Sequence, residues 1–330
     1  MKKILILGAN SFAGTSFVKY LLSKNFYVFS TSRSAKKKDP FNIYKEHVTN
    51  KNYQFKKIDI NKKKDLEKIK KIILNNKIQI IVDFGSQSMV GQSWDAPEDW
   101  VRTNCLGKLN LVRKLSKIKK IKYIRISTPE VYGDNTKKIR ENDNILPSTP
   151  YAITQATADF FTFAYTKFRG LNSITLRFAN FYGSGQQLYR IVPRTILAAL
   201  GKGKLTLDGG GTSIRSFIHR RDVASGILAT LRHGSLGETY HFSNDEFVSI
   251  KELVVKISNL MDVDMEDFCV DGPERMGKDQ AYLMNAEKVF AELGWSSAIS
   301  LSCGLIETVD WLKANIDELE KHPFEYAHQI

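Results

Sequence analysis

Two short segments of the sequence carry side chains that can exchange protons. Thr128 and Glu130 directly follow the apolar run 122–127, and because they are two residues apart their side chains can point to the same side. Tyr151 and Gln155 open a helical pattern further along the chain. Hydroxyl, carboxyl and phenol groups can act as general acids and bases. Ligands of open α/β sheets bind at strand ends, so we take these four residues as candidate catalytic groups.

A second candidate site is a glycine-containing turn near the start of the sequence. The apolar run Ile4–Leu7 is followed by Gly8-Ala9-Asn10-Ser11-Phe12-Ala13-Gly14 and then by a helical pattern. A tight turn after a strand needs Gly8, and Gly14 would let the helix pack closely on the sheet. The helix N-terminus offers free N–H groups and a positive dipole end to a pyrophosphate. The spacing predicts a dinucleotide site that includes Gly8, Asn10, Ser11, Phe12 and Gly14, with Ser11 where a middle glycine is usual.

The residue about 20 positions after such a turn indicates which dinucleotide is bound. Here the second predicted strand ends in Ser30-Thr31-Ser32-Arg33-Ser34, without an acid for the ribose hydroxyls of NAD. Arg33 suits the 2′-phosphate of NADP, so we expect NADP, with NAD as the alternative. Asp59 and Ile60 would lie at the adenine edge of the site. The nicotinamide half would lie over Phe84, Gly85 and Ser86.

The first half of the sequence alternates apolar runs with helical patterns. The predicted strands are 3–7, 27–31, 53–58, 78–84, 122–127 and 172–177. The predicted helices between them include 15–23, 63–75 and 100–117. Such alternation predicts a parallel sheet with helices on both faces, and right-handed crossovers make it a doubly wound Rossmann sheet.

The second half of the sequence has a different character. Glycines and turn residues gather at 183–187 and 201–213, and short helices are predicted at 249–261, 286–293 and 301–319. From Lys321 onward there is no strong pattern, and this stretch is expected to be loose. We therefore expect an α/β protein with a smaller C-terminal lobe for the substrate. The Rossmann domain would comprise 1–176 with return segments near 214–243, and the substrate lobe 177–213 and 244–330.

The charge balance is strongly basic, with 49 Lys and Arg against 35 Asp and Glu in 330 residues and a formal net charge of +14. The lysines occur in short runs that are not interleaved with aromatic residues, and no nucleic-acid motif accompanies them. We interpret them as a solvated surface and expect no nucleic-acid partner. A basic field would favour a small anionic substrate such as a nucleotide diphosphate.

Other features narrow the class of protein further. No apolar run approaches the ~18 residues that span a bilayer, so no membrane contact is expected. The three cysteines have no metal spacing and suggest a reduced, cytoplasmic setting. The six histidines show no ligand spacing, and we predict no metal.

Taken in order, these motifs resemble the extended short-chain dehydrogenases/reductases that act on nucleotide sugars, over nearly the whole chain. Within that family the chain is most similar to the dTDP-glucose and GDP-mannose 4,6-dehydratases. Thr128-Pro129-Glu130 stands where those enzymes have Thr-Asp-Glu or Thr-Ser-Glu, and Tyr151 with Gln155 stands where they have Tyr-x-x-x-Lys. Segment 177–183 resembles their Arg-x-Ser-Asn-x-Tyr-Gly, and 215–219 resembles a stretch whose arginine meets the substrate diphosphate.

The resemblance implies a 4,6-dehydratase that oxidises its substrate transiently and makes a 4-keto-6-deoxy sugar nucleotide. Tyr151 would take the proton of the sugar 4-hydroxyl, which Thr128 would hold. Glu130 would remove the C5 proton, water would leave from C6, and hydride would return to C6. A base beside the C5 proton distinguishes dehydratases from epimerases, so Glu130 favours dehydration.

The resemblance also implies further contacts and two departures. Asn104, Tyr151 and Gln155 would contact the cofactor, and family members usually pair through the helix near Tyr151, so a homodimer is expected. Pro129 cannot supply the acid of an aspartate, so Glu130 would return the proton to the leaving oxygen. Gln155 can still bond the nicotinamide ribose, but it lacks the charge by which a lysine lowers the tyrosine pKa. The substrate would be bound by Ser88, Asn180, Arg190, Arg215 and Arg275.

Two other functions remain open at the level of sequence. The first is a nucleotide-sugar epimerase or 4-keto reductase on the same scaffold; the run Gln87–Trp94 and Arg33 would suit a reductase. The second is an NADP(H)-binding regulator with degraded chemistry, which Pro129 and Gln155 suggest. A reductase would consume NADPH in proportion to product, whereas a regulator would bind the cofactor without turning over any sugar nucleotide.

Overall fold

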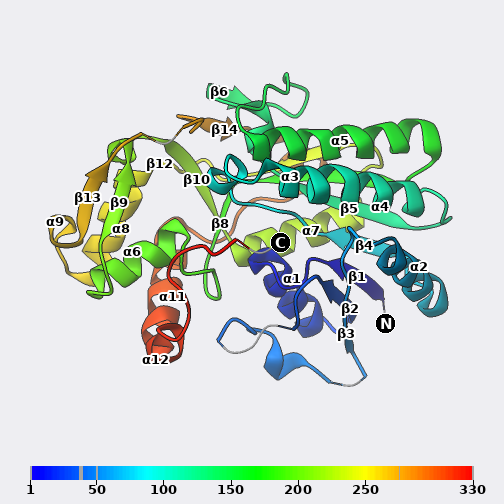
Figure 1. The fold of residues 1–330 in the computed structure, drawn as a ribbon, viewed down its shortest axis with the longest axis horizontal. Coiled ribbons are helices and arrows are strands. Elements are labelled where there is room, and N and C mark those ends of the chain that lie inside the picture. Colours follow the sequence, from blue (N-terminus) through cyan, green and yellow to red (C-terminus); the bar gives the residue numbers. More distant parts are fainter. Residues whose placement is uncertain (1, 37–39, 50, 275, 329–330) are drawn as a thin grey trace.

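The computed structural model describes residues 2–36, 40–49, 51–274 and 276–328. Its centre is a seven-stranded parallel sheet with the strand order β11-β7-β5-β4-β1-β2-β3 (Figure 1). The sequence runs outward in both directions from β1, so the doubly wound parallel sheet is confirmed. These strands are β1 (Lys3–Leu7), β2 (Tyr27–Ser32), β3 (Tyr53–Lys57), β4 (Ile80–Asp83), β5 (Lys122–Ser127), β7 (Ser173–Phe178) and β11 (Thr239–Phe242).

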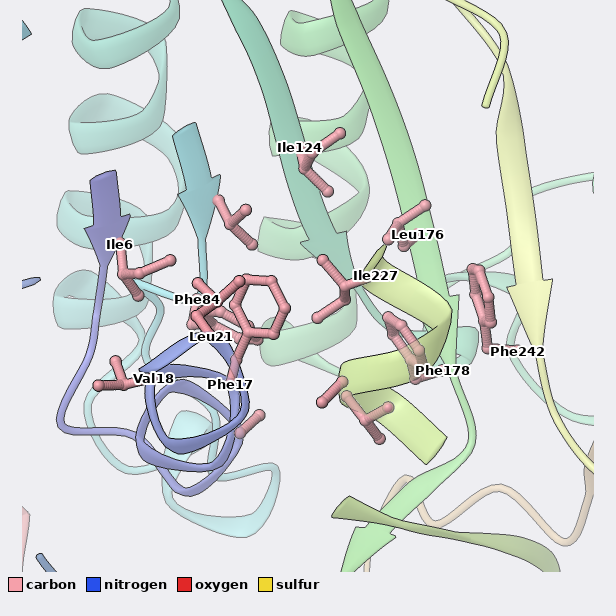
Figure 2. Close-up of a cluster of buried hydrophobic side chains, with 14 of the residues drawn as sticks. Ile6, Phe17, Val18, Leu21, Phe84, Ile124, Leu176, Phe178, Ile227 and Phe242 are labelled. Carbon is pink, nitrogen blue, oxygen red and sulfur yellow. The ribbon is translucent and has the colours of Figure 1, made fainter. Parts of the chain in front are cut away.

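Helices cover both faces of this sheet. On one face α1 (Phe12–Ser23) and α7 (Arg220–His233) pack beside each other; on the other lie α2 (Lys63–Asn76), α4 (Lys108–Leu115) and α5 (Pro150–Arg169). Alternation along β1 explains why both faces are apolar, because Ile4 and Ile6 join one core cluster while Leu5 and Leu7 join the other. Figure 2 shows the first cluster, in which Phe17 of α1 lies near Phe84.

Three predicted helices differ from the structure. The helix predicted at 301–319 is divided at Asn315 into α11 (Leu301–Ala314) and α12 (Ile316–Leu319). The first helix begins at Phe12 rather than residue 15, because Ser11 already caps it. The helix predicted at 100–117 is in fact α3 (Pro97–Trp100), a π-helical segment Val101–Gly107 and α4. A π-helical segment shifts the helix register, and here Thr103 and Asn104 are buried.

Away from the central sheet, the described chain forms a second region with three small sheets and several helices. One sheet joins β8 (Asn180–Tyr182), β10 (Ile214–His219) and β12 (Phe247–Ser249). The others pair β9 (Leu205–Asp208) with β13 (Cys269–Gly272), and β6 (Asn135–Ile139) with β14 (Tyr282–Met284). Its helices are α6 (Ile191–Ala199), α8 (Ile250–Met261), α9 (Met265–Phe268), α10 (Glu287–Leu293), α11 (Leu301–Ala314) and α12 (Ile316–Leu319). The division of the chain into two lobes at the predicted boundaries stays a prediction.

Short 3₁₀ helices and the segment after α12 complete the described chain. The 3₁₀ helices are Lys45–His47, Gly91–Ser93, Pro129–Tyr132 and Gly209–Gly211. After α12 the chain runs back toward α1, drawn in red in Figure 1. There the ring of His328 stacks on Trp100 with centroids 5.1 Å apart, so this stretch is held by contacts rather than loose. No described helix is long and apolar enough to cross a membrane.

Candidate active site

The turn between β1 and α1 has the geometry that its glycines allow. Gly8 has a φ of +73°, and a Cβ atom there would lie 2.5 Å from the amide nitrogen of Gly85. A Cβ atom at Gly14 would lie 2.5 Å from the carbonyl oxygen of Gly8. Any larger side chain at either position would push the turn away from the neighbouring backbone. Gly14 itself lines neither of the cavities described below.

Ser11 has a role that a middle glycine could not have. Its hydroxyl oxygen accepts a hydrogen bond from the amide of Gly14 (3.0 Å), which makes Ser11 the N-cap of α1. The amides of Phe12 and Ala13 belong to the first helical turn, where backbone donors have no intrahelical acceptor. Ser11, Phe12 and Ala13 all line a cavity, so these donors suit a pyrophosphate. The residues present therefore fit a dinucleotide.

A cavity of about 490 Å³ extends from this turn along the carboxyl ends of the central strands. Asn10 is fixed in its wall by a hydrogen bond from Nδ2 to the hydroxyl of Ser34 (2.8 Å). Because the strand ends of β1, β2 and β4 all contribute, residues far apart in sequence meet here. The residues predicted to bind the cofactor that line it are Gly8, Asn10, Ser11, Arg33, Asp59, Ile60, Phe84, Gly85 and Ser86.

A second cavity of about 650 Å³ adjoins the first and extends into the second region. The two share wall residues that include Ser11, Phe84, Ser86 and Tyr189, so they are neighbouring parts of one cleft. The predicted residues that line the second cavity are Ser11, Phe12, Phe84, Ser86, Ser88, Glu130, Asn180, Arg190 and Arg215. The cleft thus offers one compartment to a dinucleotide and an adjoining one to a substrate.

The strand end after β5 positions Thr128 and Glu130. Thr128 caps the 3₁₀ helix Pro129–Tyr132, and its hydroxyl oxygen accepts from the amide of Glu130 (3.4 Å). Pro129 suits the first position of this helix, where no amide donor is needed. The Glu130 carboxylate accepts a hydrogen bond from the Tyr282 hydroxyl (3.5 Å), which also donates to Asn180 (3.0 Å). Glu130 therefore reaches the second cavity from the central sheet.

Tyr151 lies behind this cavity and is 8% exposed. Thr149 caps α5 by accepting from the amide of Ala152 (3.1 Å), which fixes Tyr151 in the first turn of the helix. Burial raises the pKa of Tyr151 well above its ordinary value, and the charge of Glu130 raises it further. A hydrogen bond with Thr128 and the charge of Arg190 act in the opposite direction. Tyr151 and Thr128 contact each other, but neither lines either of the two cavities.

Gln155 connects the cleft to a buried guanidinium group. Its side-chain oxygen accepts from Nη2 of Arg125 (2.6 Å), and its side-chain nitrogen donates to the hydroxyl of Ser86. Arg125 is 1% exposed. Gln155 does not line either cavity, but Ser86 lines both. The nicotinamide ribose would therefore either contact Ser86, which Gln155 holds, or replace Ser86 as the hydrogen-bond partner of Gln155.

Position 155 carries no charge, but the positively charged Arg125 lies directly behind it. Arg125 pairs with Asp159 (3.0 Å), and the same carboxylate pairs with Arg177 (3.0 Å). These three buried groups carry two positive charges and one negative charge. Gln155 links this excess positive charge to Ser86 through its amide dipole. Gln155, which replaces the charged lysine of the family motif, therefore lies next to a cation in the fold.

Two further buried groups hold the floor of the dinucleotide compartment. Asp83 accepts from Lys108 (2.6 Å) and from the amide of Gly85 (2.9 Å), which fixes the backbone after β4. Burial lowers the pKa of Lys108 to about 8, against the attraction of Asp83. Asn104 is 0% exposed, and its side-chain oxygen accepts from Ser86 (3.1 Å) and from the amide of Gln87 (3.0 Å). Asn104 lines neither cavity; it positions Ser86 instead.

The predicted substrate-binding arginines differ in how firmly they are held. Three backbone carbonyls accept from Arg215, including that of Asp279 (2.6 Å), and its guanidinium lies 4.1 Å from the ring centre of Tyr282. Arg190 donates to the hydroxyl of Ser88 (3.3 Å). Arg215 is thus a rigid part of the wall, and Arg190 is better placed to move toward an anion. Arg275 lies outside the described residues.

The structure also brings Tyr282, Lys278 and the last described segment into the site. Tyr282 joins Glu130 to Asn180 across the cavity, although these residues lie on β14, after β5 and on β8. Lys278 lines the second cavity and donates to the carbonyl of Asp208 (2.7 Å). The segment after α12 lines the first cavity. Nothing in the local sequence pattern marks this segment, because it has no periodicity and no motif.

Comparison with known proteins agrees with this geometry. A family model described as GDP-mannose 4,6 dehydratase matches residues 5–308. The low-salt glycan biosynthesis protein Agl12 of Haloferax volcanii is 29% identical over 314 residues, which cover 93% of this chain and 97% of that protein.

Two solved structures give the same result for the fold. DesIV, a dTDP-glucose 4,6-dehydratase from Streptomyces venezuelae with NAD and TYD bound, superposes with a TM-score of 0.90 at 25% identity, covering 97% of this chain and 99% of that one. The dTDP-glucose 4,6-dehydratase rfbB of Bacillus anthracis, in complex with NAD, has a TM-score of 0.87 at 29% identity, covering 96% and 98%. Because the family model spans residues 5–308, this chain belongs to the GDP-mannose 4,6-dehydratase family, within the extended short-chain dehydrogenases/reductases.

Proposed function

We propose that this protein is a nucleotide-sugar 4,6-dehydratase, which converts a nucleotide-linked hexose into its 4-keto-6-deoxy derivative. The observation that carries the proposal is the Glu130 carboxylate, which lines the substrate cavity beside Tyr282. The charge of Glu130 also acts on the Tyr151 phenol. A base and a phenol at one strand end are the pair that C5 deprotonation and C4 oxidation require.

The residues have separate tasks in this reaction. Thr128 orients the sugar 4-hydroxyl, and Tyr151 takes its proton. When bound, the nicotinamide ring supplies reversible oxidation at C4 and reduction at C6. Glu130 removes the C5 proton, made acidic by the neighbouring ketone, and returns it to the oxygen that leaves C6 as water. Pro129 supplies no acid for the leaving oxygen, so Glu130 acts as both base and acid in the elimination. After hydride reaches C6, C5 takes up a proton, and the proton that Tyr151 accepted from the 4-hydroxyl balances this step.

The substrate diphosphate is proposed to lie between Arg190, Arg215 and Asn180. Arginine suits this task because its guanidinium matches phosphate oxygens with two donors. Arg190 and Arg215 both line the second cavity, together with Asn180 and Ser88. Lys278 in the same wall adds a further positive charge. Arg275, which the resemblance also implied, stays a prediction.

One experiment tests the proposed activity directly. The purified protein is incubated with a panel of nucleotide-linked hexoses, and the products are followed by mass for the loss of one water. We expect one or more substrates to lose water without net consumption of cofactor. Isomerised products without water loss would favour an epimerase, and stoichiometric loss of reduced cofactor would favour a reductase; either result would contradict dehydration.

A nicotinamide dinucleotide is the cofactor, and we propose that it is NADP. Arg33 lines the dinucleotide cavity beside the hydroxyls of Ser32 and Ser34. An arginine at this place binds a 2′-phosphate, whereas an acid would hold the ribose of NAD. The two solved relatives carry NAD, so the choice is tested by titrating both cofactors. Arg33→Ser should weaken NADP binding about tenfold or more and leave NAD binding nearly unchanged; equal losses would contradict it.

We also propose a homodimer that forms through α5. Apolar side chains on its outer face are exposed, and they recur at helical spacing. The neighbouring π-helical segment packs beside α5 and carries further exposed apolar side chains. The residues of this apolar face are Val101, Leu106, Ile153, Phe160, Phe163 and Phe168. A cytoplasmic location is likewise proposed, in keeping with the three free cysteines.

A further inference from the structure

The segment after α12 forms part of the wall of the dinucleotide cavity. His322, Pro323, Glu325, Tyr326 and Ala327 all line the cavity that Gly8, Ser11 and Arg33 line from the opposite side. We refer to residues 322–328 as the strap. The chain runs from α12 back toward α1 (Figure 1), and the strap forms a wall of the same cavity as the turn before α1.

The strap is held at three places along its length. His322 packs edge-on against the ring of Phe41, with ring centres 5.1 Å apart. In its middle Tyr326 packs against Tyr189 at 5.2 Å, and Tyr189 lines both cavities.

Its far end is fixed most specifically. The ring of His328 stacks on Trp100 at 5.1 Å, with an angle of 14° between the planes, and its Nε2 lies 2.9 Å from Asp99. Trp100 is fully buried at the end of α3, so this end is attached to a rigid part of the Rossmann domain. His328 itself does not line the cavity, whereas the residues before it do. Nδ1 of His328 also lies 3.2 Å from the hydroxyl of Tyr326, so His328 joins the cavity wall to Trp100 and Asp99, and we refer to these contacts as the latch.

We propose that the strap retains the nicotinamide dinucleotide, and that the dinucleotide enters and leaves only when His328 separates from Trp100 and Asp99. This inference rests on the proposed function, because it takes the first cavity as the dinucleotide compartment. Slow exchange suits a dehydratase, since the hydride taken from the sugar returns to the same sugar. The ring contacts of the strap are individually weak, so its opening remains possible on the time scale of exchange.

The test measures how fast the cofactor leaves, not how fast the enzyme turns over. The holoprotein is loaded with NADPH and mixed with an excess of NADP⁺, and the decay of the bound nicotinamide fluorescence gives the dissociation rate. His328→Ala should raise this rate about tenfold, with a matching loss of affinity. Lys321→Ala is the matched control: Lys321 pairs with Glu318 one helical turn away and lines neither cavity, so its rate should equal that of the unmodified protein.

A second variant separates the latch from a general loss of structure. Asp99→Ala removes the carboxylate that His328 contacts, and the double variant should release NADPH no faster than His328→Ala alone. Thermal melting of each variant checks that the fold is intact. Unchanged release in His328→Ala would overturn the proposal, and slower release would show that the strap competes with the cofactor instead. Failure of the unmodified protein to bind any nicotinamide dinucleotide would instead refute the dinucleotide compartment itself.

Discussion

Glu130 is the residue whose chemistry most sharply separates the possible reactions. We predict that Glu130→Gln lowers the rate of water loss by roughly 10²- to 10⁴-fold, the usual contribution of a general base. Oxidation at C4 does not need this carboxylate, so reduced nicotinamide should still appear by absorbance in a single turnover. Mass analysis of the product gives the elimination rate. Elimination at the original rate in Glu130→Gln would remove Glu130 from its role.

Tyr151 should titrate abnormally in the cofactor-free protein. Burial first and the charge of Glu130 second raise its pKa, so we predict that it stays protonated where free tyrosine is half-ionised, near pH ~10. The ultraviolet absorbance of tyrosinate in the unmodified protein, minus that of Tyr151→Phe, isolates this phenol. Glu130→Gln should move its titration to lower pH, as should oxidised cofactor, whose ring is positive. A Tyr151 that ionises at or below the ordinary value would contradict the prediction.

The linkage between this pKa and stability has a definite sign. Because the folded pKa lies above the unfolded one, the unfolded chain loses its proton first as the pH rises. The stabilising contribution of Tyr151 is therefore complete below pH ~10 and declines above it. Activity should change in the opposite direction, since the phenolate is the form that takes the sugar proton.

Gln155 shows how a residue's meaning depends on its neighbours. In the sequence it replaces a lysine and removes a charge. In the fold it accepts a hydrogen bond from Arg125 and donates to Ser86. We predict that Gln155→Met costs about 1–3 kcal/mol of unfolding free energy, because the buried Arg125 donor loses its acceptor. Urea unfolding measures this; a loss within error of zero would show that Asp159 and the backbone carbonyls of Ile126 and Gln155 are sufficient acceptors for Arg125.

At the scale of elements, the β1–α1 turn carries the strictest backbone requirement. Gly8 and Gly170 both have positive φ, +73° and +69°, but only Gly8 has backbone atoms where a Cβ atom would go. Gly170→Ala should therefore cost about 1–2 kcal/mol from backbone strain alone. Gly8→Ala should cost more than this and also weaken dinucleotide binding. Urea unfolding and cofactor titration of both variants check this, and equal effects would contradict it.

The elements themselves were largely predictable, and their irregularities were not. Six of the seven central strands follow from apolar runs, because a buried parallel strand must be apolar on both faces. The seventh, β11, was not predicted as a strand. The π-helical segment Val101–Gly107 was predicted as part of an ordinary helix. Its local sequence fits a helix, whereas the hydrogen bonds of Asn104 to Ser86 and Gln87 depend on the neighbouring strand. Packing between elements therefore sets that register.

At the scale of the whole molecule, the apolar face on α5 predicts the state of association. Phe160→Glu with Phe163→Glu should convert the dimer to a monomer, because each charge would be buried against a second copy. Phe290→Glu is the matched control, since Phe290 on α10 is also well exposed, at 65%, but lies outside this face. Light scattering during gel filtration gives the mass of each variant. A dimer that survives the double change would contradict the proposed interface.

The sequence alone determined the Rossmann sheet, the dinucleotide turn and the strand end that carries Thr128 and Glu130. These features are local, because each depends on the spacing of apolar residues and the position of glycine within a short stretch of sequence. The tertiary structure alone decided that Arg125 stands behind Gln155, that Tyr282 bridges Glu130 and Asn180, and that the segment after α12 lines the first cavity. Each of these joins segments that no local pattern connects, so only the packing of the complete chain could bring them together.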